Sequence, residues 1–390
     1  MRRVRLKEFG TFYSGLSGKS KSDFSEGNAL LVTYRNIFNN PVLNPAIKDT
    51  VVVGKDEKQN EVLWGDILIT GSSETPADAG MSSVVLFNPQ EKMYLNRFCF
   101  GFRLNDMNEA LPSYIGHLLR STSIRAAISK TAFGVTRFNV NRMRFADIEI
   151  PLPPLNIQKE IVSILDSFTS LIGKMKQEVE MRKKQMEYYR EKLMAPQTNW
   201  KIKTLGEIGT FTRGNGLQKS DFRVKGFPCV HYGQIHTYYN TCIYKTKSFC
   251  EEDLAKKLQK ASYGDLLIAT TSEDVKACCK AAVWFGAGDV AYSGDSFCYS
   301  HDQDPKYMAY LFQTEMFAKQ KQKAATGAKV IRVSGESMAS FSFAFPPLVQ
   351  QRQIASILDT FESYISKLEK MIELRQKQYE YYREKLLTFE

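Results

Sequence analysis

The sequence Pro153-Pro154-Leu155 opens a segment that closes with Glu187-Tyr188-Tyr189-Arg190-Glu191-Lys192-Leu193 and that occurs twice in the chain. The second copy runs from Pro346-Pro347-Leu348 to Glu380-Tyr381-Tyr382-Arg383-Glu384-Lys385-Leu386, shifted by 193 residues. When residues 153–193 are aligned with residues 346–386, 24 of the 41 positions are identical. Unrelated helices share a hydrophobic period but not residues at this rate. The segment therefore indicates an internal duplication, and its length makes it a duplication of domains rather than a short solenoid repeat.

Each copy has the hydrophobic pattern of one long helix with an apolar stripe. The apolar residues recur at steps of four and three, a pattern typical of a coiled-coil interface. Arg182 and Arg375 interrupt the stripe at the same position of each copy. We predict that the two helices pair as an antiparallel coiled coil about a pseudo-twofold axis, because this pairing buries both stripes. The alternative is that each helix buries its stripe on its own domain. The predicted interface residues are Ile161, Leu165, Phe168, Ile172, Met175, Val179, Met186, Tyr189, Leu193, Ile354, Leu358, Phe361, Ile365, Leu368, Ile372, Tyr379, Tyr382 and Leu386.

The residues that precede each helix are also related, although more weakly. Leu6-x-Glu8-x-Gly10-Thr11-Phe12 returns as Leu205-x-Glu207-x-Gly209-Thr210-Phe211, and Gly65-Asp66-Ile67 returns as Gly264-Asp265-Leu266. Short β-type runs mix with helical runs in both halves, so each half is predicted to contain an α+β domain. The loops between the matched positions differ, which is typical of two recognition modules on one scaffold. The predicted boundaries are 1–150 and 196–345 for the globular domains, and 151–195 and 346–390 for the helices.

The composition is that of a globular protein with an anionic partner. The 390 residues are 43% hydrophobic and 24% charged, and the formal net charge is +11. This excess favours nucleic acid as a partner over a membrane surface. No apolar run approaches the roughly 18 residues of a membrane span. The seven cysteines include no C-x-x-C pair, so we expect neither a disulfide framework nor a metal site, and a cytoplasmic location.

Two motifs resemble nucleotide or metal sites but do not meet their requirements. The run Gly15-Leu16-Ser17-Gly18-Lys19-Ser20 lacks the first glycine of a P-loop, because Tyr13 stands there. We therefore expect its lysine to face phosphate or solvent. Asp265 with Asp274-x-Lys276 is similar to the acidic pair and lysine of a metal-dependent nuclease. The first half offers no matching acid and lysine after Asp66, so we expect Asp66 and Asp265 to tie a turn in each domain.

The proline pairs at the start of the two helices also resemble a catalytic motif. In amino-methyltransferases a polar residue, two prolines and an aromatic residue hold the flipped base. Here Leu155 and Leu348 replace the aromatic residue, and no glycine-rich cofactor loop lies upstream. We expect the prolines to end a strand and to start the helix.

The remaining chemistry is that of binding, because the loops interleave cations, amides and aromatic residues. Arginine can make bidentate bonds to guanine, Asn and Gln can bond adenine, and lysine mostly meets phosphates. We therefore predict that these loops contact DNA. The candidates in the first half are Lys19, Lys21, Tyr34, Arg35, Asn36, Arg137, Asn139, Asn141 and Arg142. The candidates in the second half are Arg213, Lys219, Arg223, His231, Tyr232, Gln234, His236, Lys329 and Arg332.

The whole chain resembles the specificity subunit of type I restriction-modification systems. The resemblance rests on the run from Ile150 to Asp166, on its second copy from Phe345 to Asp359, and on the paired domain starts. It implies two target recognition domains that bind a bipartite sequence in double-stranded DNA. It also implies helices that bind two methyltransferase subunits, with ATP-dependent restriction and translocase subunits joining for cleavage. The chain itself would be non-catalytic and would bind no cofactor, because the partner subunits use S-adenosylmethionine, ATP and Mg²⁺.

Two other classes of protein fit part of the sequence. A fused enzyme of the type IIG kind would carry its own methyltransferase, but the sequence shows no cofactor loop. A coiled-coil scaffold for protein partners would explain the helices, but it would leave the basic domains with divergent loops unexplained.

Overall fold

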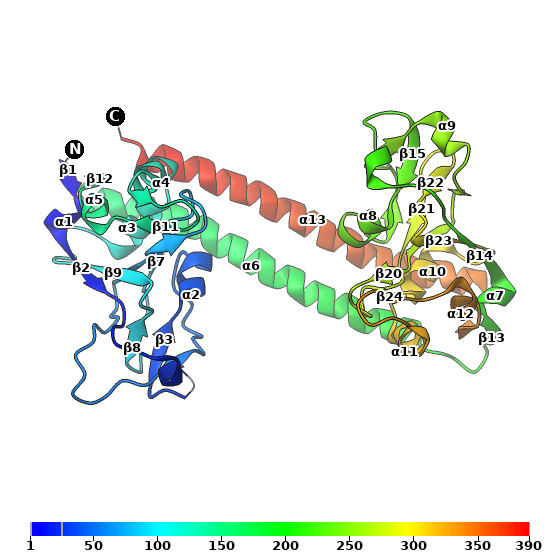
Figure 1. The fold of residues 1–390 in the computed structure, drawn as a ribbon, viewed down its shortest axis with the longest axis horizontal. Helices are drawn as coiled ribbons and strands as arrows, with labels where there is room; N and C mark the ends of the chain where they lie inside the picture. The colour runs from blue at the N-terminus through cyan, green and yellow to red at the C-terminus, as the bar shows by residue number, and fades with distance from the viewer. Residues whose placement is uncertain (1, 25, 390) are drawn as a thin grey trace. The chain divides into compact units, whose positions relative to one another are not determined.

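The computed structural model describes residues 2–24 and 26–389, and it divides into two compact units. Unit 1 comprises the chain up to Lys176 together with the chain from Lys370 onward, and unit 2 comprises Gln177–Glu369. Each unit therefore holds one globular domain and a part of both long helices (Figure 1). Unit boundaries consequently fall inside the helices, whereas the sequence analysis placed domain boundaries at the helix ends.

The domain of unit 1 is built around a central strand whose two faces are both buried. In β5 (Ile67–Thr70), Ile67 and Ile69 belong to one hydrophobic core, and Leu68 belongs to another on the opposite face, because side chains alternate along a strand. One core also contains residues of α3 (Pro112–Leu119) and α4 (Thr122–Ser129), and the other contains residues of β3 (Ala29–Val32) and β8 (Met93–Leu95). The antiparallel sheet β2-β9-β5-β7 consists of β2 (Gly10–Ser14), β9 (Cys99–Leu104), β5 and β7 (Ser82–Val84). The sheet β4-β3-β8 consists of β4 (Thr50–Val51), β3 (Ala29–Val32) and β8 (Met93–Leu95), with β3 and β8 parallel.

Short helices and a terminal strand pair complete this domain. The pairing of β1 with β12 brings the start of the domain to its end, directly before the first long helix. The helices are α1 (Leu6–Phe9), η1 (Lys21–Phe24), α2 (Tyr34–Asn39), α3 (Pro112–Leu119), α4 (Thr122–Ser129) and α5 (Arg142–Ala146). The terminal strands are β1 (Arg2–Arg5) and β12 (Glu149–Leu152).

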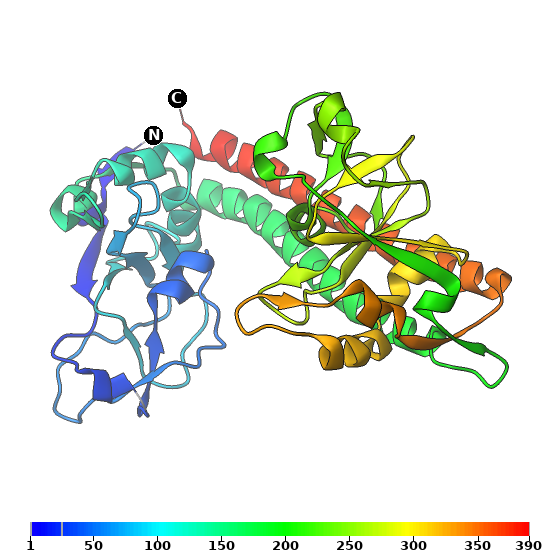
Figure 2. The ribbon, with the colours of Figure 1, turned by 45° about the vertical axis from the view of Figure 1, so that its right-hand side comes forward.

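The domain of unit 2 repeats this plan with additions at its edges (Figure 2). In β19 (Leu266–Ala269), Leu266 and Ile268 lie in one core and Leu267 lies in another, as in β5. The main sheet consists of β14 (Gly209–Arg213), β23 (Ser296–His301), β19, β21 (Lys280–Trp284) and β16 (Cys242–Ile243). The second sheet consists of β17 (Ser248–Cys250), β15 (Phe227–Val230), β22 (Val290–Tyr292) and β18 (Lys260–Ala261). The terminal pair is β13 (Lys201–Thr204) with β25 (Ser342–Phe345). The helices are α7 (Leu205–Ile208), η2 (Lys219–Asp221), α8 (Tyr232–Thr237), α9 (Glu252–Ala255), α10 (Pro305–Leu311), α11 (Glu315–Ala324) and α12 (Gly335–Ala339).

The turns before β5 and β19 are tied by the two aspartates that the sequence assigned to them. An Asp66 Oδ2 atom accepts a hydrogen bond from the Leu63 N–H at 2.8 Å, and Asp265 Oδ2 accepts one from the Ser262 N–H at 2.8 Å. Gly65 and Gly264 adopt φ values of 85° and 92° in these turns, which glycine tolerates best. The structural role predicted for both aspartates is confirmed.

Each long helix begins where the prolines were expected to start it. Strand β12 ends at Leu152 and α6 (Leu155–Leu193) begins two prolines later, and β25 and α13 (Leu348–Leu387) repeat this order. The helices are 39 and 40 residues long. The proline pairs therefore separate a strand from a helix in both copies.

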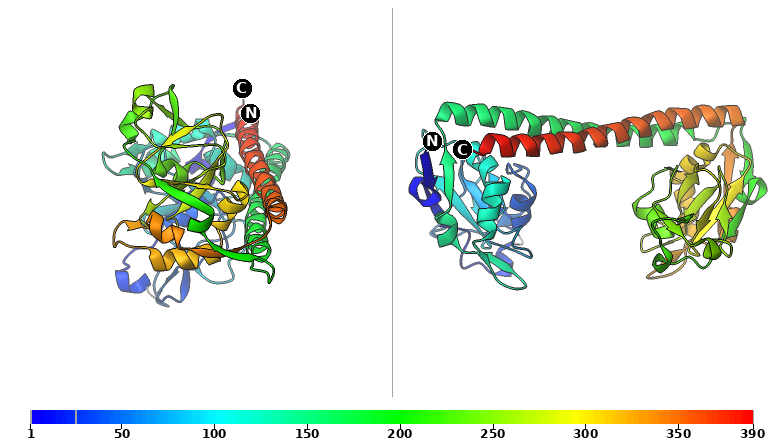
Figure 3. Two further views of the ribbon diagram at one scale, coloured as in Figure 1. Left: turned by 90° about the vertical axis from the view of Figure 1, so that its right-hand side faces the viewer. Right: turned by 90° about the horizontal axis from the view of Figure 1, so that it is seen from above.

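Within each unit the two helix segments pack side by side in opposite directions (Figure 3). In unit 1 the ring of Phe168 stacks on that of Tyr382, with centroids 5.5 Å apart. In unit 2 the ring of Tyr189 stacks on that of Phe361 at the same distance. The first part of α6 thus meets the last part of α13 in unit 1, and the reverse holds in unit 2. The predicted fold class, two similar α+β domains with antiparallel paired helices, is confirmed.

The apolar stripe also packs on the domains, so both readings of it are partly right. Ile161 and Leu165 lie in the same core as domain residues of unit 1, and Ile354 and Leu358 do so in unit 2. The remaining interface residues are buried or half-buried except Tyr382. This residue is 39% exposed, although its ring stacks on that of Phe168.

Two further observations concern the cysteines and the hydrophobicity of the helices. All seven cysteines lie among the described residues, and all are free. In the part of the chain that the structure describes, no helix is long and apolar enough to cross a membrane.

Candidate nucleic-acid interface

A short hairpin projects several of the predicted DNA-contacting residues in unit 1. Hairpin 1, defined as residues 132–140, consists of β10 (Ala132–Phe133) and β11 (Phe138–Val140), and β11 also pairs with β6 (Ser72–Ser73). The register sets Phe133 opposite Asn139 and Asn139 opposite Ser72. Residues directly opposite each other in an antiparallel sheet share a face. An aromatic residue, an amide and a hydroxyl thus lie in one row across the sheet.

The turn of hairpin 1 requires a glycine and holds a cation. Gly134 adopts φ 135°, and a Cβ atom there would lie 2.0 Å from the Arg137 carbonyl oxygen, so only glycine fits this turn. Arg137 donates hydrogen bonds from Nη2 and Nε to Ser72 Oγ at 3.0 and 3.2 Å. Its guanidinium also lies 5.2 Å from the ring centre of Phe98. Arg137 is therefore positioned by the protein while its residue remains exposed.

Unit 2 builds the same hairpin with different side chains. Hairpin 2, defined as residues 325–333, pairs Thr326 with Arg332, and its strand β24 (Ile331–Arg332) pairs with β20 (Thr271–Ser272). Gly327 adopts φ 103°, and a Cβ atom there would lie 2.1 Å from the Val330 carbonyl oxygen. The row across this sheet reads Thr326, Arg332 and Thr271. The scaffold is retained and the chemistry that it presents is changed.

A cleft of about 550 Å³ adjoins hairpin 1 and contains Tyr34 and Arg137. Tyr34 stacks on Phe38 within α2, at 5.7 Å between ring centres. Asn36 instead closes the helix start, because its Oδ1 accepts from the Thr33 N–H and hydroxyl. Arg35 is exposed on the same helix. The cleft also contains Glu74 and Asp78, so its charge is mixed.

In unit 2 a cleft of about 470 Å³ contains three predicted residues, which are Arg213, His231 and Tyr232. His231 is the N-cap of α8, and its Nδ1 accepts from the Gly233 N–H at 3.1 Å. Burial, and then the nearby Lys219, lower the pKa of His231. His236 donates from Nε2 to the Thr271 carbonyl oxygen at 3.0 Å, and burial lowers its pKa too. Both histidines are thus neutral at neutral pH and suit hydrogen bonding rather than charge pairing.

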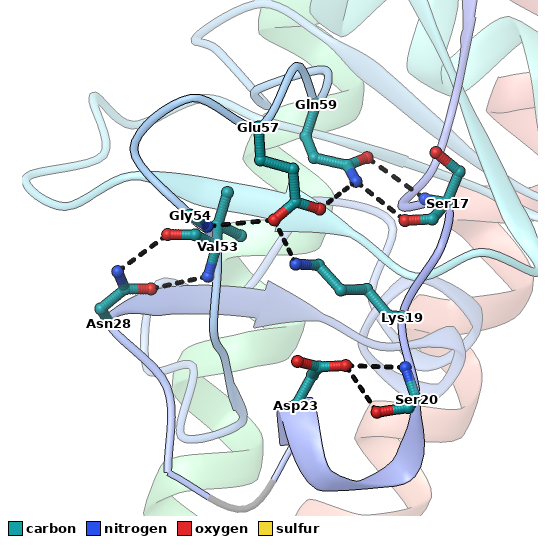
Figure 4. A network of polar contacts seen from close by, with 9 residues as sticks. All are labelled: Ser17, Lys19, Ser20, Asp23, Asn28, Val53, Gly54, Glu57 and Gln59. Carbon is teal, nitrogen blue, oxygen red and sulfur yellow. Dashed lines mark hydrogen bonds and ion pairs between the residues drawn. The ribbon is translucent and has the colours of Figure 1, made fainter.

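Lys19 belongs to a polar network that ties two loops of unit 1 together (Figure 4). Glu57 accepts hydrogen bonds from Lys19, Gln59 and the Gly54 N–H, and these lower its pKa to about 2. Gln59 in turn exchanges two hydrogen bonds with the backbone of Ser17. The Lys19 side chain is only 7% exposed. The expectation that this lysine faces phosphate or solvent is therefore wrong, because Glu57 neutralises it inside the loop cluster.

Several other predicted residues already have partners within the protein. Asn141 caps α5 through bonds from the Met143 and Arg144 N–H groups, and Gln234 bonds the His231 N–H and the Ser248 hydroxyl. Other pairs are Arg142 with Ser14, Arg213 with the Gly294 carbonyl, and Arg223 with Glu251. Lys21, Lys219 and Lys329 are exposed. Contact with DNA stays a prediction for all of these residues.

The register of the hairpins identifies residues that the sequence analysis missed. Phe133 and Val135 are 57% and 90% exposed, and Phe98 carries the guanidinium groups of Arg137 and Arg97. Apolar residues next to Gly134 read as ordinary strand residues in the sequence. Only the pairing of β10 with β11, and of β11 with the distant strand β6, places them on an exposed hairpin.

The acidic residues of the nuclease-like motif have structural roles. Asp274 Oδ1 accepts from the Lys276 N–H at 3.0 Å, and Asp265 ties its turn. Across residues 2–24 and 26–389, no group of three or more His, Cys, Asp and Glu side chains is arranged to hold a metal ion.

The comparisons with known proteins agree with this architecture. The profile of the type I restriction modification DNA specificity domain matches residues 1–181 and again residues 197–376. This is a family of DNA-specificity modules, and the chain contains two of them. The chain therefore belongs to the type I restriction-modification specificity family.

Individual relatives place the chain within the same family. It is 30% identical over 272 residues to a putative type I restriction enzyme specificity subunit of Haemophilus influenzae, with 66% of this chain and 68% of that protein covered. It is 28% identical over 256 residues to the EcoR124I/EcoR124II specificity subunit of Escherichia coli, with 62% of this chain and 63% of that protein covered.

Solved structures share the fold at low sequence identity. The S subunit of a type I system from M. genitalium matches with a TM-score of 0.57 at 15% identity, covering 100% of this chain and 96% of that one. A chain from a type I R-M system, solved to study complex assembly and conformational transition, matches with a TM-score of 0.58 at 14% identity. That match covers 99% of this chain and 97% of the other.

Proposed function

We propose that this chain is the non-catalytic specificity subunit of a type I restriction-modification complex and that each domain reads one half of a bipartite double-stranded DNA sequence. The observation that carries the proposal is the pair of hairpins. Both have the same turn and the same pairing to the strand after the central one, yet their side chains differ. One scaffold used twice with different chemistry is what two different half-sites require.

The hairpins fit the geometry of direct readout. The major groove of B-DNA, about 12 Å wide, admits a two-stranded β-ribbon. In unit 1 the Asn139 amide suits adenine, and in unit 2 the Arg332 guanidinium suits guanine. Lys21 and Lys219, on the short helices η1 and η2, suit phosphates, which fix position but carry no sequence information.

The proposal assigns the chemistry to partner subunits. A methyltransferase subunit would use S-adenosylmethionine to methylate adenine in the bound site, and a restriction subunit would use ATP and Mg²⁺ for translocation and cleavage. This chain would supply the choice of site and the surfaces that hold the partners. We expect it to act in the cytoplasm, where it can reach the DNA.

Exposed apolar residues on the helices support a docking role for two copies of one partner. Four positions on α6 have counterparts on α13, and the members of each pair have nearly equal exposure. The pairs are Ile164 and Ile357 (41% and 44%), Leu171 and Tyr364 (41% and 44%), Met181 and Leu374 (51% and 52%), and Tyr188 and Tyr381 (60% and 61%). Unit 1 carries Ile164, Leu171, Leu374 and Tyr381, and unit 2 carries the other four. The two residues of each helix segment, called a cluster below, lie seven positions apart and therefore on one face of the helix, which makes them candidate contacts for a partner.

Charged substitutions in these clusters test the stoichiometry. Because Ile164 and Leu171 are exposed, Ile164→Glu with Leu171→Glu should leave the fold intact and remove one methyltransferase copy. The matched variant Ile357→Glu with Tyr364→Glu should remove the other copy, and the fourfold variant should remove both. The mass of the purified complex reports the number of copies. Two copies retained by every variant would contradict this assignment.

The function itself is tested by binding and methyl transfer measured together. The purified chain with its methyltransferase partner should prefer one bipartite duplex over scrambled DNA and should methylate adenine in it. The chain alone with S-adenosylmethionine should transfer no methyl group. Methyl transfer by the chain alone would indicate the fused-enzyme alternative, and the absence of DNA binding would indicate a scaffold for protein partners.

A further inference from the structure

Val135 stands at the tip of hairpin 1 and is 90% exposed. Single exposed apolar residues are ordinary on protein surfaces, so exposure alone decides nothing. The hairpin that carries Val135 is, however, held by backbone pairing, because β10 pairs with β11 in the register Ala132 with Val140 and Phe133 with Asn139. Strand β11 is fixed further by its pairing with β6. The protein thus holds an aliphatic side chain in solvent at a defined place.

The surroundings of Val135 have the chemistry of DNA recognition. Phe133 lies opposite the Asn139 amide, and both are exposed. Two guanidinium groups, those of Arg97 and Arg137, lie 5.1 and 5.2 Å from the ring centre of Phe98. A hairpin that carries an exposed aliphatic side chain, an exposed amide and a guanidinium suits a surface that is anionic overall and apolar at one point.

The thymine C5-methyl group is the apolar feature that a base pair presents in the major groove. We propose that Val135 reads a thymine by packing against this methyl group in the half-site bound by unit 1. The inference rests on the proposed function and names one base-specific contact of that site. Hairpin 2 carries Ala328 at the matching position, with Lys329 exposed beside it, so the other half-site would meet a shorter side chain next to a cation.

Replacing thymine by deoxyuridine removes this methyl group and nothing else, so it tests the contact without altering the protein. The complex of full-length chain and methyltransferase would be titrated with duplexes of its recognised sequence. Each thymine of the unit 1 half-site would be replaced singly by deoxyuridine. At one position binding should weaken about fourfold, which corresponds to about 0.8 kcal/mol for one methyl(ene) group.

A substitution at Val135 completes a double-mutant cycle. Val135→Ala should bind the thymine and deoxyuridine duplexes within about 1.5-fold of each other, because the group that senses the methyl is gone; the cycle isolates this pairwise effect. Val224→Ala is the matched control, since Val224 is 89% exposed in unit 2. This control should keep the fourfold difference. The loss of affinity that Val135→Ala causes should be the same with thymine and with deoxyuridine in the other half-site.

Three results would overturn the inference while leaving the proposed function intact. They are a unit 1 half-site that contains no thymine, no thymine position that responds to deoxyuridine, and a full response that persists in Val135→Ala. The second result is also what a valine wedged between stacked bases would give, since such a wedge does not depend on the methyl group. Binding to a scrambled duplex as tight as to the recognised sequence would instead refute the proposed function, so the two failures are distinguishable.

Discussion

Lys19 and Lys21 lie two residues apart in unit 1, but their ammonium groups have different surroundings. Glu57 neutralises Lys19, whose side chain is 7% exposed, whereas Lys21 is exposed. The affinity of a protein for B-DNA falls with salt by a slope of about 0.9 for each phosphate that it neutralises. We expect Lys21→Ala to reduce this slope by about one and Lys19→Ala to leave it unchanged. Measuring the binding constant at several salt concentrations gives the slope for each variant. Equal slopes for the two variants would contradict the prediction.

His231 makes unit 2 sensitive to acid. Burial lowers its pKa below the ordinary value of about 6.5, and its Nδ1 must stay unprotonated to accept the Gly233 N–H. Between the two pKa values the unfolded chain binds more protons, so stability is lost as the pH falls through this window.

We expect thermal unfolding of unit 2 to shift to lower temperature between pH 7.5 and pH 5.5. His231→Asn should show a smaller shift, because asparagine caps a helix without titrating. His231→Ala should cost about 1 kcal/mol at neutral pH through loss of the cap. An equal acid shift in wild type and His231→Asn would rule out His231 as the cause.

Residue types could be predicted from the sequence better than residue roles. Asn36, Asn141 and Gln234 were expected at DNA because of their amides, and each amide bonds the backbone near a helix start. A polar side chain in a loop serves a cap or a ligand equally well, and only the coordinates decide which. Val135 is the opposite case, since its apolar side chain gave no sequence signal for the contact that we propose.

At the scale of elements, each domain depends on the end of a helix that belongs to the other half of the sequence. In unit 1 the carboxylate of Glu384 accepts hydrogen bonds from the Thr122 N–H at 2.9 and 3.0 Å, at the start of α4. In unit 2 the carboxylate of Glu191 accepts from the Glu315 N–H at 3.1 and 3.2 Å, at the start of α11. The two contacts are related by the 193-residue shift of the duplication.

Truncation after Lys370 should therefore destabilise unit 1 selectively. It removes Tyr379 and Leu387 from the unit 1 core, each contributing roughly 2 kcal/mol by burial. Amide hydrogen exchange should accelerate in α3 and α4 and stay slow in α10 and α11. Glu384→Gln, which keeps the helix, should show a much smaller effect. Equal acceleration in both domains, or none, would contradict the exchange of helix ends.

The long helices were predictable because their pattern is long and repeated. A period maintained over 39 residues and copied once leaves little choice of structure. The hairpins were not predictable, because β6, β10 and β24 are two residues long and because β11 and β24 pair with strands far away in the chain, β6 and β20. Such pairs are set by tertiary packing, and local sequence carries little information about them.

At the scale of the whole molecule, the duplication explains why the two domains share one architecture. The differences between their loops fit the recognition of two different half-sites. The sequence shows two related halves, and the structure shows two units with the same central strand, turn and hairpin. The predicted domain boundaries treated the helices as separate parts, and the compact units instead share them. Helix pairing could be inferred from the stripe, but the sharing of each helix between units depends on contacts such as that of Glu384 with Thr122.

In the function that we propose, each domain reads its own half-site. Exchanging residues 200–345 for the second domain of another family member, with both helices kept, tests it directly. Sequencing of methylated adenines in cells that carry the chimera and its methyltransferase gives the recognised sequence. We predict that one half-site changes to that of the donor and the other half-site stays the same. A change in both halves together, or in neither, would contradict the claim.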